Sequence, residues 1–418
     1  MNINCVCTIV SSNYLAYAVT LYKSIKKYYS DVDFLVLIVD RKSEEISKAV
    51  KRSGLNVIYA DELLIADFEH IAFKYDVVEL NTALKPSFLK LLFGLNYKSL
   101  IYLDPDICLY SKLAPVYSAL ENSNIVLIPH ITNAVMDGFR PSEIDFLRAG
   151  VFNLGFVALK NVKESIRLLD WWEERCLSYG FNDMSFGTFV DQKWMDLAPC
   201  LFEGVNILKN PACNVAYWNL HERFLDEKKG QLLVNNEPLC FFHFSGVNVF
   251  NSYTLSKYQD RYIILESTVL KGLISDYCKS VIANEHEMYS KINYTFNTFN
   301  NGEKINHLAR RASCTDKRFS KKPFDNKSIN YKYLKKYGFL KKSGESYSNI
   351  NTTNLSTKKI ELKLFNLVIR IFAKLIGINR ISSILQYASI LNRESNLGSV
   401  IYNKDFNFKH EKHRYRFE

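Results

Sequence analysis

Apolar runs of strand length alternate with amphipathic segments of helix length across residues 1–107, and this order limits the chain to few folds. The run "DFLVLIVD" (33–40) is almost wholly apolar, as expected of a strand buried on both faces. A helical pattern precedes it at 15–29, and "SEEISKAVKRSG" (43–54) follows it as a capped helix. Strands at 3–10, 55–61 and 99–107 continue the order. We therefore predict an α/β fold with a mostly parallel, doubly wound sheet and helices on both faces.

Polar residues follow several of these strands at the point where each strand ends. The segment "SSN" (11–13) follows the first strand, Asp40 the second, and Asp104 with Asp106 the fourth. Doubly wound sheets bind ligands outside the carboxyl ends of their strands. These residues therefore mark the edge of the sheet where we expect a ligand.

Asp104 and Asp106 in "LIYLDPDICLY" stand two residues apart, so their side chains project from the same face of the strand. Two carboxylates held together repel each other unless a cation lies between them or one is protonated. Pro105 fixes φ and donates no hydrogen bond, which suits a chain that leaves a sheet. The segment predicts a divalent cation site, and a solvated turn at the strand end is the alternative.

Three later segments also place polar side chains beside apolar runs. The strand "GVFNLGFVAL" (150–159) carries Asn153 and Gly155. "FVDQKWMDLAPCLF" (189–202) has Asp191 and Gln192 at a predicted helix start, and "CFFHFSGVN" (240–248) ends an apolar strand with His243. For the last of these, a histidine satisfied near the core is the alternative to a functional one.

The chain is predicted to have three parts: a catalytic α/β domain at 1–265, a helical and basic loop-rich extension at 266–350, and basic amphipathic helices at 351–418. The net charge of +11 is concentrated in the second part, where residues 304–342 hold 13 lysines and arginines against two acidic residues. Basic asymmetry of this kind indicates an anionic partner such as a membrane surface or nucleic acid.

The segment "KKIELKLFNLVIRIFAKLIGINR" (358–380) predicts a helix with a narrow polar stripe on a broadly apolar surface. Such a helix suits the plane of an anionic membrane, where long basic side chains reach the headgroups. Packing against the catalytic domain or a second subunit is the alternative. The stripe consists of Lys359, Lys363, Asn366, Arg370, Lys374 and Gly377.

Nine cysteines are scattered without CxxC spacing, which favours reduced, buried thiols over a disulfide framework or a zinc cluster. The N-terminal residues show no charged region followed by a long apolar region, so no signal peptide is predicted. No uncharged apolar stretch reaches the length of a membrane-spanning helix. We expect a cytoplasmic protein.

Five motifs in order resemble the nucleotide-sugar glycosyltransferases of GT-A fold, in particular glycosyltransferase family 8 of the bacterial lipopolysaccharide and capsule type. The resemblance covers about residues 1–260, and the order of the motifs is more specific than any one of them. The motifs are "TIVSSNYLAYAVTLYKSI" (8–25), "YLDPDI" (102–107), "FNLGF" (152–156), "DQKWMD" (191–196) and "HFSG" (243–246).

The resemblance implies a set of site residues and a cofactor. Asp104, Asp106 and His243 would bind Mn²⁺ or Mg²⁺. Asp191, Gln192 and Asn153 would be catalytic or contact the transferred sugar, although a helix-capping aspartate and a turn asparagine are the alternatives. The residues implied in donor binding are Ile9, Ser11, Asn13, Lys85, Asp104, Gly155 and Gly246; for Lys85 a solvated lysine at a helix start is the alternative.

Two departures from the family pattern bear on the donor. Val249 and Phe250 stand where the family has a Lys-Pro-Trp that clamps the diphosphate, and Ser11 stands where several relatives have an acidic residue. The diphosphate charge would then be met by Lys85 or by the basic segment.

The implied function is transfer of a hexose, with retention, from a nucleotide sugar to a glycan or lipid-linked acceptor at the inner leaflet, in the synthesis of surface polysaccharide such as O-antigen or capsule. UDP-sugars are the favoured donors. The rivals are a non-catalytic protein that binds sugar nucleotides and a basic nucleic-acid-binding protein. The second is disfavoured because no recognised nucleic-acid-binding module is present.

Overall fold

The computed structural model describes residues 4–264, 268–315, 317–340 and 359–391. The contacts of the chain divide it into two compact units, Met1–Asn297 and Thr298–Glu418. Each unit is described by itself. Unit 1 includes two helices beyond the predicted boundary at residue 265, and the three-part division of the chain remains a prediction.

Unit 1 is built on a seven-stranded sheet with the order β10-β6-β7-β4-β1-β2-β3. Only β7 runs against the direction of its neighbours, so the sheet is mostly parallel as predicted. The strands are β1 (Asn4–Val10), β2 (Asp33–Ile38), β3 (Asn56–Tyr59), β4 (Ser99–Leu103), β6 (Ile125–Leu127), β7 (Phe156–Lys160) and β10 (Val205–Ile207).

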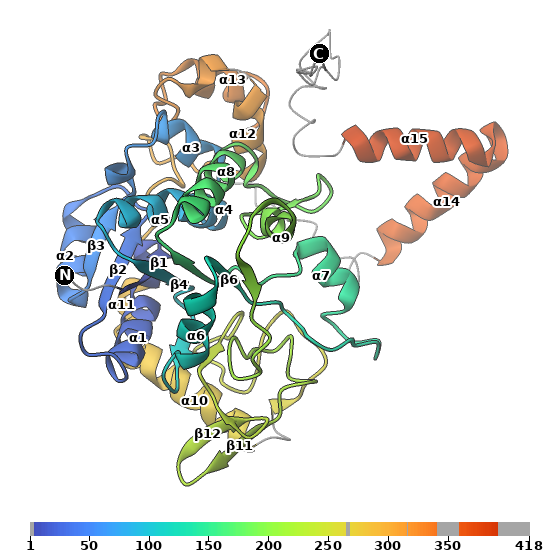
Figure 1. Ribbon diagram of the computed structural model, residues 1–418. Helices are drawn as coiled ribbons and strands as arrows, with labels where there is room; N and C mark the ends of the chain where they lie inside the picture. The colour runs from blue at the N-terminus through green and yellow to red at the C-terminus, as the bar shows by residue number, and fades with distance from the viewer. Residues whose placement is uncertain (1–3, 265–267, 316, 341–358, 392–418) are drawn as a thin grey trace, which may run out of the picture. The chain divides into compact units, whose positions relative to one another are not determined.

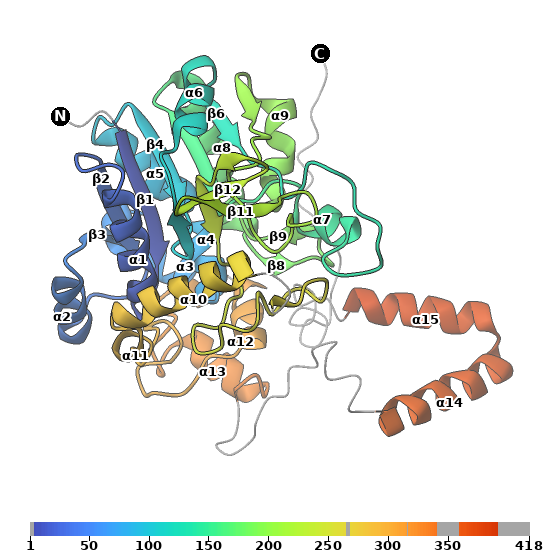
Figure 2. The same cartoon turned by 90° about the horizontal axis from the view of Figure 1, so that it is seen from below.

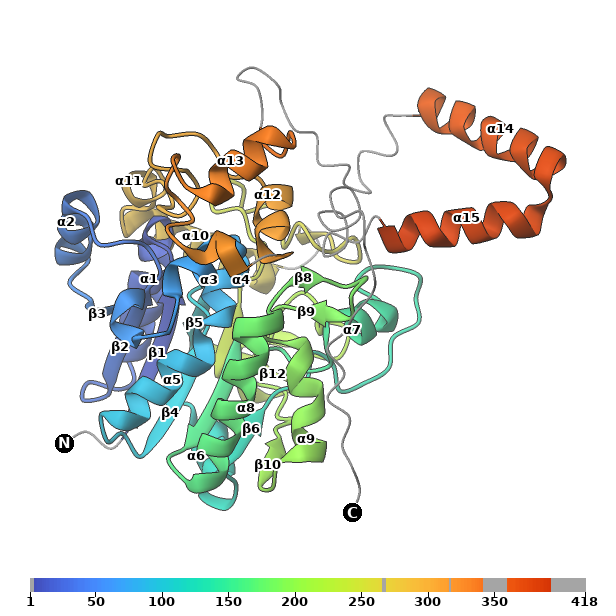
Figure 3. The same ribbon diagram turned by 90° about the horizontal axis from the view of Figure 1, so that it is seen from above.

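Helices cover both faces of this sheet, which confirms the predicted fold class. Figure 2 shows α1 and α10 in front of one face, and Figure 3 shows α5 and α8 in front of the other. The helices of unit 1 are α1 (Leu15–Lys26), α2 (Glu44–Ser53), α3 (Phe68–Lys74), α4 (Val77–Ala83), α5 (Lys85–Gly94), α6 (Ala114–Asn122), α7 (Glu143–Ala149), α8 (Lys163–Tyr179), α9 (Ala198–Leu201), α10 (Thr268–Ala283) and α11 (His286–Tyr289).

Local sequence explains where these elements form. Every residue of β4 is buried, as expected of a strand covered by helices on both faces. The hydroxyl of Ser43 accepts a hydrogen bond from the Ile46 amide and caps α2, while Gly54 ends that helix with φ of +69°. At the start of α5, Pro86 occupies a first-turn position, where its missing N–H costs nothing.

Short strands outside the main sheet form three smaller sheets. The antiparallel pair of β5 (Ile107–Leu109) and β14 (Phe241–His243) is the one that matters for the site. A further pair is formed by β8 (Asn182–Asp183) and β9 (Thr188–Phe189). A three-stranded ribbon contains β11 (Leu225–Lys228), β12 (Gln231–Val234) and β13 (Glu237–Pro238).

Unit 2 is mainly helical, which confirms the predicted helical C-terminal extension. It contains α12 (His307–Ala312), α13 (Ile329–Lys336), α14 (Lys359–Ile376) and α15 (Ile378–Leu391), all drawn in orange to red in Figure 1. Among the residues the structure describes, no helix is both long and apolar enough to cross a membrane. Residues 341–358 and 392–418, which fall in the predicted basic and amphipathic regions, lie outside the described residues.

Candidate active site

The strand pair β5–β14 brings His243 beside the two aspartates. β4 ends at Leu103, and a tight turn follows in which the Ile107 amide donates to the Asp104 carbonyl at 3.1 Å. Ile107 then pairs with His243, and the Phe244 amide donates to the Asp106 carbonyl at 2.8 Å. Main-chain hydrogen bonds thus hold the histidine against the turn, although the segments are far apart in sequence.

Asp104, Asp106 and His243 each offer a ligand atom, and these atoms lie within 4.8 Å of one another. The His243 Nε2 atom is 3.0 Å from Asp106 Oδ1 and 3.9 Å from Asp104 Oδ2. The imidazole is buried, while the carboxylates are 33% and 25% exposed, so the group opens on one side. Two carboxylates and one imidazole are a donor set that suits Mn²⁺ or Mg²⁺ and leaves coordination positions for a ligand.

The electrostatics of the cluster favour added positive charge. Burial opposes a charge on His243, yet the nearby carboxylates of Asp106 and Asp104 outweigh it and raise the pKa of the imidazole above its ordinary value. The Tyr102 hydroxyl donates to Asp104 Oδ1 at 2.7 Å and fixes that carboxylate. A proton or a metal ion on His243 Nε2 therefore relieves the repulsion that two adjacent aspartates create.

Gly155 lets the main chain pass directly behind the cluster. A Cβ atom at this position would lie 2.4 Å from His243 Cε1 and 2.9 Å from both Asn153 Oδ1 and Asp104 Oδ2. The Gly155 carbonyl also accepts a hydrogen bond of 2.8 Å from the Asp104 amide. Only glycine therefore fits at position 155, because any side chain would collide with His243, Asn153 and Asp104.

Lys85 and Asp191 form a buried ion pair beside the cluster. Lys85 Nζ lies 2.6 Å from Asp191 Oδ2, and both side chains are 2% exposed. The ammonium also donates to the Leu154 carbonyl at 2.7 Å and lies 4.2 Å from the centre of the Tyr102 ring. Burial raises the pKa of Asp191, and the charge of Lys85 only partly opposes this effect. In this structure the charge of Lys85 is therefore directed at Asp191.

Asn153 and Gln192 are both tied to their surroundings by amide hydrogen bonds. Gln192 accepts from the Leu154 amide at 3.1 Å and donates to the Ala149 carbonyl at 3.1 Å. Asn153 Oδ1 lies 3.2 Å from His243 Nδ1 and accepts from Asn214 at 3.1 Å. The predicted catalytic roles of these amides remain predictions.

A cavity of about 560 Å³ joins these groups. The predicted residues Lys85, Asp104, Asp106, Asn153, Gly155, Asp191, Gln192 and His243 all line it. The rest of its wall is rich in rings, supplied by His130, Phe146, Phe189, Tyr217, Trp218 and Tyr258. The cavity thus combines a charged floor with an aromatic wall, as a site for a polar, ring-containing ligand requires.

The predicted donor-binding residues Ile9, Ser11, Asn13 and Gly246 do not line that cavity. Ser11 donates to Asn13 Oδ1 at 2.6 Å just beyond the end of β1. The next residue that follows them, Tyr14, is 44% exposed, and burial together with the Asp106 charge raises its pKa. An exposed ring that the sequence analysis did not single out therefore stands directly after the predicted donor-binding segment.

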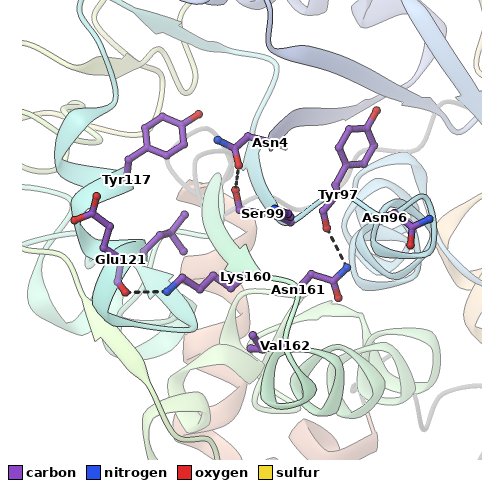
Figure 4. Close-up of a pocket in the computed structure, with 11 residues that line it drawn as sticks. Asn4, Asn96, Tyr97, Ser99, Tyr117, Glu121, Lys160, Asn161 and Val162 are labelled. Atoms are coloured by element: carbon purple, nitrogen blue, oxygen red, sulfur yellow. Dashed lines mark hydrogen bonds between the residues drawn. The ribbon is translucent and has the colours of Figure 1, made fainter. Parts of the chain in front are cut away.

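A second cavity, of about 500 Å³, lies at the opposite edge of the sheet, where β1 and β4 begin (Figure 4). Its polar groups bond mainly to one another: Ser99 donates to Asn4 at 2.6 Å, and Lys160 donates to the Glu121 carbonyl at 2.9 Å. Glu121 is the single carboxylate among its lining residues. This cavity has one carboxylate and no histidine in its lining, so it offers fewer groups for catalysis or metal binding than the first.

The sequence analysis missed three side chains at the site: His130, which lines the first cavity, and Asn214 and Tyr102, which bond to the lining residues Asn153 and Asp104. A usable signal existed for His130, because it follows the strand "IVLIP" at the edge where polar residues were expected. Asn214 lies in an irregular loop and Tyr102 within a strand that is apolar throughout, so neither position carried a signal.

No family model matches the chain. The uncharacterized protein YfnF of Bacillus subtilis (strain 168) is 28% identical over 252 residues, which cover 58% of this chain and 81% of that protein. The uncharacterized protein YfnD of the same organism is 25% identical over 243 residues, covering 57% of this chain and 76% of that protein.

Among solved structures, the chain is similar to the galactosyltransferase LgtC in complex with donor and acceptor sugar analogues, with 15% identity, a TM-score of 0.38, and coverage of 66% of this chain and 95% of that one. It is also similar to GlyE of Streptococcus pneumoniae TIGR4, with 14% identity, a TM-score of 0.39, and coverage of 75% and 73%. The bifunctional WbbM matches with 14% identity, a TM-score of 0.39, and coverage of 70% and 50%. All three are glycosyltransferases, the class that the sequence motifs resemble.

Proposed function

We propose that the protein is a metal-dependent glycosyltransferase that transfers a hexose from a nucleotide sugar, with UDP-sugars favoured, to a glycan acceptor. The observation that carries this proposal is the convergence of Asp104, Asp106 and His243 at the carboxyl edge of the sheet, in a cavity that also holds Lys85 and Asp191.

The reaction explains why such a group is needed. A sugar leaves its nucleoside diphosphate with growing negative charge on the diphosphate, and this charge must be neutralised in a site with little water. Bound Mn²⁺ or Mg²⁺ supplies that neutralisation. Asp104, Asp106 and His243 would hold the ion, and both aspartates are partly exposed and line the cavity that would receive the donor.

The other residues of the cavity bind and orient the sugar. Asp191, Gln192 and Asn153 would contact the transferred hexose, where a carboxylate stabilises the positive charge that develops at the anomeric carbon. Lys85 holds the Asp191 carboxylate in place from behind, through the contact of 2.6 Å. Ile9, Ser11, Asn13 and Gly246 would contact the nucleoside and its phosphates. The aromatic wall excludes water, and retention of anomeric configuration follows the family that the motifs resemble.

The proposal is tested by Asp106→Asn, with Asp226→Asn on the exposed ribbon as the matched control. In the wild type and the control, Mn²⁺ with the correct UDP-sugar should raise the melting temperature, because a ligand that binds only the native state stabilises it. The Asp106→Asn protein should lose both this rise and the release of nucleoside diphosphate. Retained turnover in Asp106→Asn would contradict the proposed metal site. Donor-dependent stabilisation of the wild type without any product would instead identify a non-catalytic binding protein.

We also propose that α14 holds the enzyme on the anionic inner leaflet, where a lipid-linked saccharide of surface polysaccharide synthesis is presented. Leu367, Ile371 and Leu375 on this helix are large, apolar and exposed, while Arg370 and Lys374 are exposed and basic. A helix with these two properties suits the plane of a membrane, with its apolar side chains in the acyl region. Held in this way, the protein would be a cytoplasmic, peripheral membrane protein.

Charge reversal tests this part without altering the catalytic unit. Arg370→Glu/Lys374→Glu should weaken binding to phosphatidylglycerol vesicles by roughly thirtyfold or more, because each basic residue near an anionic surface contributes about 1 kcal/mol. Lys279→Glu/Lys291→Glu reverses two exposed charges of unit 1 and should leave binding unchanged. Equal binding by both double variants in a co-sedimentation assay would contradict the proposal.

A further inference from the structure

A chain of buried polar groups runs from a main-chain carbonyl to the imidazole of the metal cluster. His130 Nδ1 lies 3.2 Å from the Val151 carbonyl oxygen, and His130 Nε2 lies 3.3 Å from Asn153 Nδ2. Asn153 Oδ1 in turn lies 3.2 Å from His243 Nδ1. His130 and Asn153 are each 7% exposed and His243 is 4% exposed, so water has little access to the chain.

The contact between His130 and the Val151 carbonyl determines which group donates in each of these hydrogen bonds. A carbonyl oxygen can only accept, so His130 carries a proton on Nδ1. Burial lowers the pKa of His130 to about 4, and the neutral ring then has a lone pair on Nε2. Asn153 must present its amide N–H to that lone pair, which turns its Oδ1 atom toward His243. An amide oxygen is an acceptor, so the proton of a neutral His243 lies on Nδ1 and the lone pair on Nε2.

A second contact agrees with this orientation of Asn153. The Asn214 side chain, which is fully buried, donates from Nδ2 to Asn153 Oδ1 at 3.1 Å. Asn219, also fully buried, donates to the carbonyls of both Asn214 and His130, at 3.0 and 3.1 Å. Asn219 thereby ties the main chains of His130 and Asn214 to one another. If the Asn153 amide were flipped, its N–H group would point at the Asn214 N–H group, and neither could accept a hydrogen bond.

Aromatic packing holds the two imidazoles in place. The His130 ring stacks on Phe146 with centroids 5.2 Å apart, and it meets Trp218 edge to face at 5.3 Å. Trp218 meets His243 in the same manner at 5.1 Å. The packing therefore leaves the two rings little freedom to rotate. The hydrogen bonds then determine which ring nitrogen carries the proton.

We propose that His130 is a positioning residue that, acting through Asn153, fixes His243 in the Nδ1–H tautomer and so keeps Nε2 available for the divalent cation. The inference rests on the proposed function, since it concerns the same metal site. Without this chain, a neutral His243 is free to place its proton on Nε2 and donate it to Asp106 Oδ1, 3.0 Å away. That alternative would occupy the site with a hydrogen bond. A histidine ligand oriented through its second nitrogen is a general device of metal sites.

His130→Phe is the direct test, because phenylalanine keeps the ring that stacks on Phe146 and removes both nitrogens. We expect the variant to bind Mn²⁺ about tenfold to a hundredfold more weakly than the wild type, the usual effect of losing such a partner. His130→Gln places an amide oxygen near the position of Nε2 and should recover part of the affinity. His286→Phe makes the same substitution at a buried histidine that is not part of this series of hydrogen bonds, and it should bind Mn²⁺ as the wild type does.

Two readouts separate positioning from a loss of fold. Mn²⁺ affinity is measured by electron paramagnetic resonance titration, alongside the melting temperature without metal. In the metal-free protein at alkaline pH, ¹⁵N NMR of labelled histidine reports the tautomer of His243, assigned through His243→Gln. The wild type should show the Nδ1–H form, and His130→Phe a mixture of both forms. A melting temperature of His130→Phe equal to that of His286→Phe, with only the former weak in Mn²⁺ binding, supports the proposal.

The failures are distinguishable. If the wild type itself binds no Mn²⁺, the proposed function fails and the inference is overturned with it. If the wild type binds Mn²⁺ and His130→Phe binds it within twofold with an unchanged His243 tautomer, the metal site stands and only the role of His130 is overturned.

Discussion

The ion pair of Lys85 and Asp191 allows a quantitative prediction, because both side chains are 2% exposed and their charged atoms are 2.6 Å apart. At an effective dielectric constant of 20, two unit charges at that distance attract by about 6 kcal/mol. Taking each ion out of water costs several kcal/mol, and the raised pKa of Asp191 shows that burial outweighs the help from Lys85 for this carboxyl. The pair should therefore add little net stability, while either ion left alone should be costly.

The perturbation is a double-mutant cycle of Lys85→Met and Asp191→Asn. Each single variant should lose about 3–5 kcal/mol of unfolding free energy, because it leaves one buried charge unpaired. The double variant should lose clearly less than either single variant, since no unpaired charge remains. As a control, Lys90→Met removes a lysine that is 33% exposed and pairs with Asp170 and Glu173, and should cost about 1 kcal/mol or less.

Urea unfolding followed by tryptophan fluorescence measures these losses. All four tryptophans lie in unit 1, and Trp172 reports the pair directly because its indole nitrogen donates to the Asp191 carbonyl at 3.0 Å. Losses of the two single variants that add within about 0.5 kcal/mol in the double variant would show that the charges are not coupled. That result would refute the reasoning from burial and distance.

Two further outcomes follow from the site. Gly155→Ala should weaken Mn²⁺ binding at least tenfold by calorimetry, because the new Cβ would lie 2.4 Å from the His243 ring; affinity equal to that of the wild type would show that the ring can shift without cost. Stability should also depend on pH through His130, whose pKa is about 4 in the folded protein against 6.5 ordinarily. Below pH 6.5 the unfolded chain binds the proton and the folded protein does not, so stability should fall by up to about 3 kcal/mol between pH 6.5 and 4 and stay level above. His130→Phe should lack this part of the decline in urea unfolding, and an identical pH dependence in both proteins would contradict it.

The strands of the main sheet could be predicted because they are buried on both faces. A strand such as β4 has no polar side to confuse with a helix, and its apolar run ends where the chain leaves the sheet. The same logic placed Asp40, Asp104 and Asp106 at the carboxyl edge. The reversed direction of β7 could not be predicted, because its apolar run reads the same whether the strand is parallel or antiparallel.

The convergence of His243 with the aspartates lay beyond sequence periodicity. It depends on the pairing of β5 with β14, and strands of three residues are too short to show any repeat. The resemblance to a known family pointed to His243 as a ligand, and the pairing of β5 with β14 explains why it lies beside the aspartates. The pairing of Lys85 with Asp191 was missed for a different reason. The position of Lys85 at a helix start suggested that it faces a ligand, whereas its burial against Tyr102 and Asp191 depends on tertiary packing alone.

The charge of the cavity explains why, under the proposed function, a cation would bind there before an anionic donor does. Four aspartates line it, Asp104, Asp106, Asp145 and Asp191, against two cationic side chains, Lys85 and Arg140. Lys85 is paired with Asp191 at 2.6 Å and Arg140 with Asp145 at 2.9 Å, so the two carboxylates that remain are those of the cluster. With the four aspartates ionised and both His130 and His243 neutral, the lining carries a charge of −2 that would repel a diphosphate. Under the proposed function, one divalent ion would cancel that charge, so that a donor carrying two phosphates could enter without this repulsion.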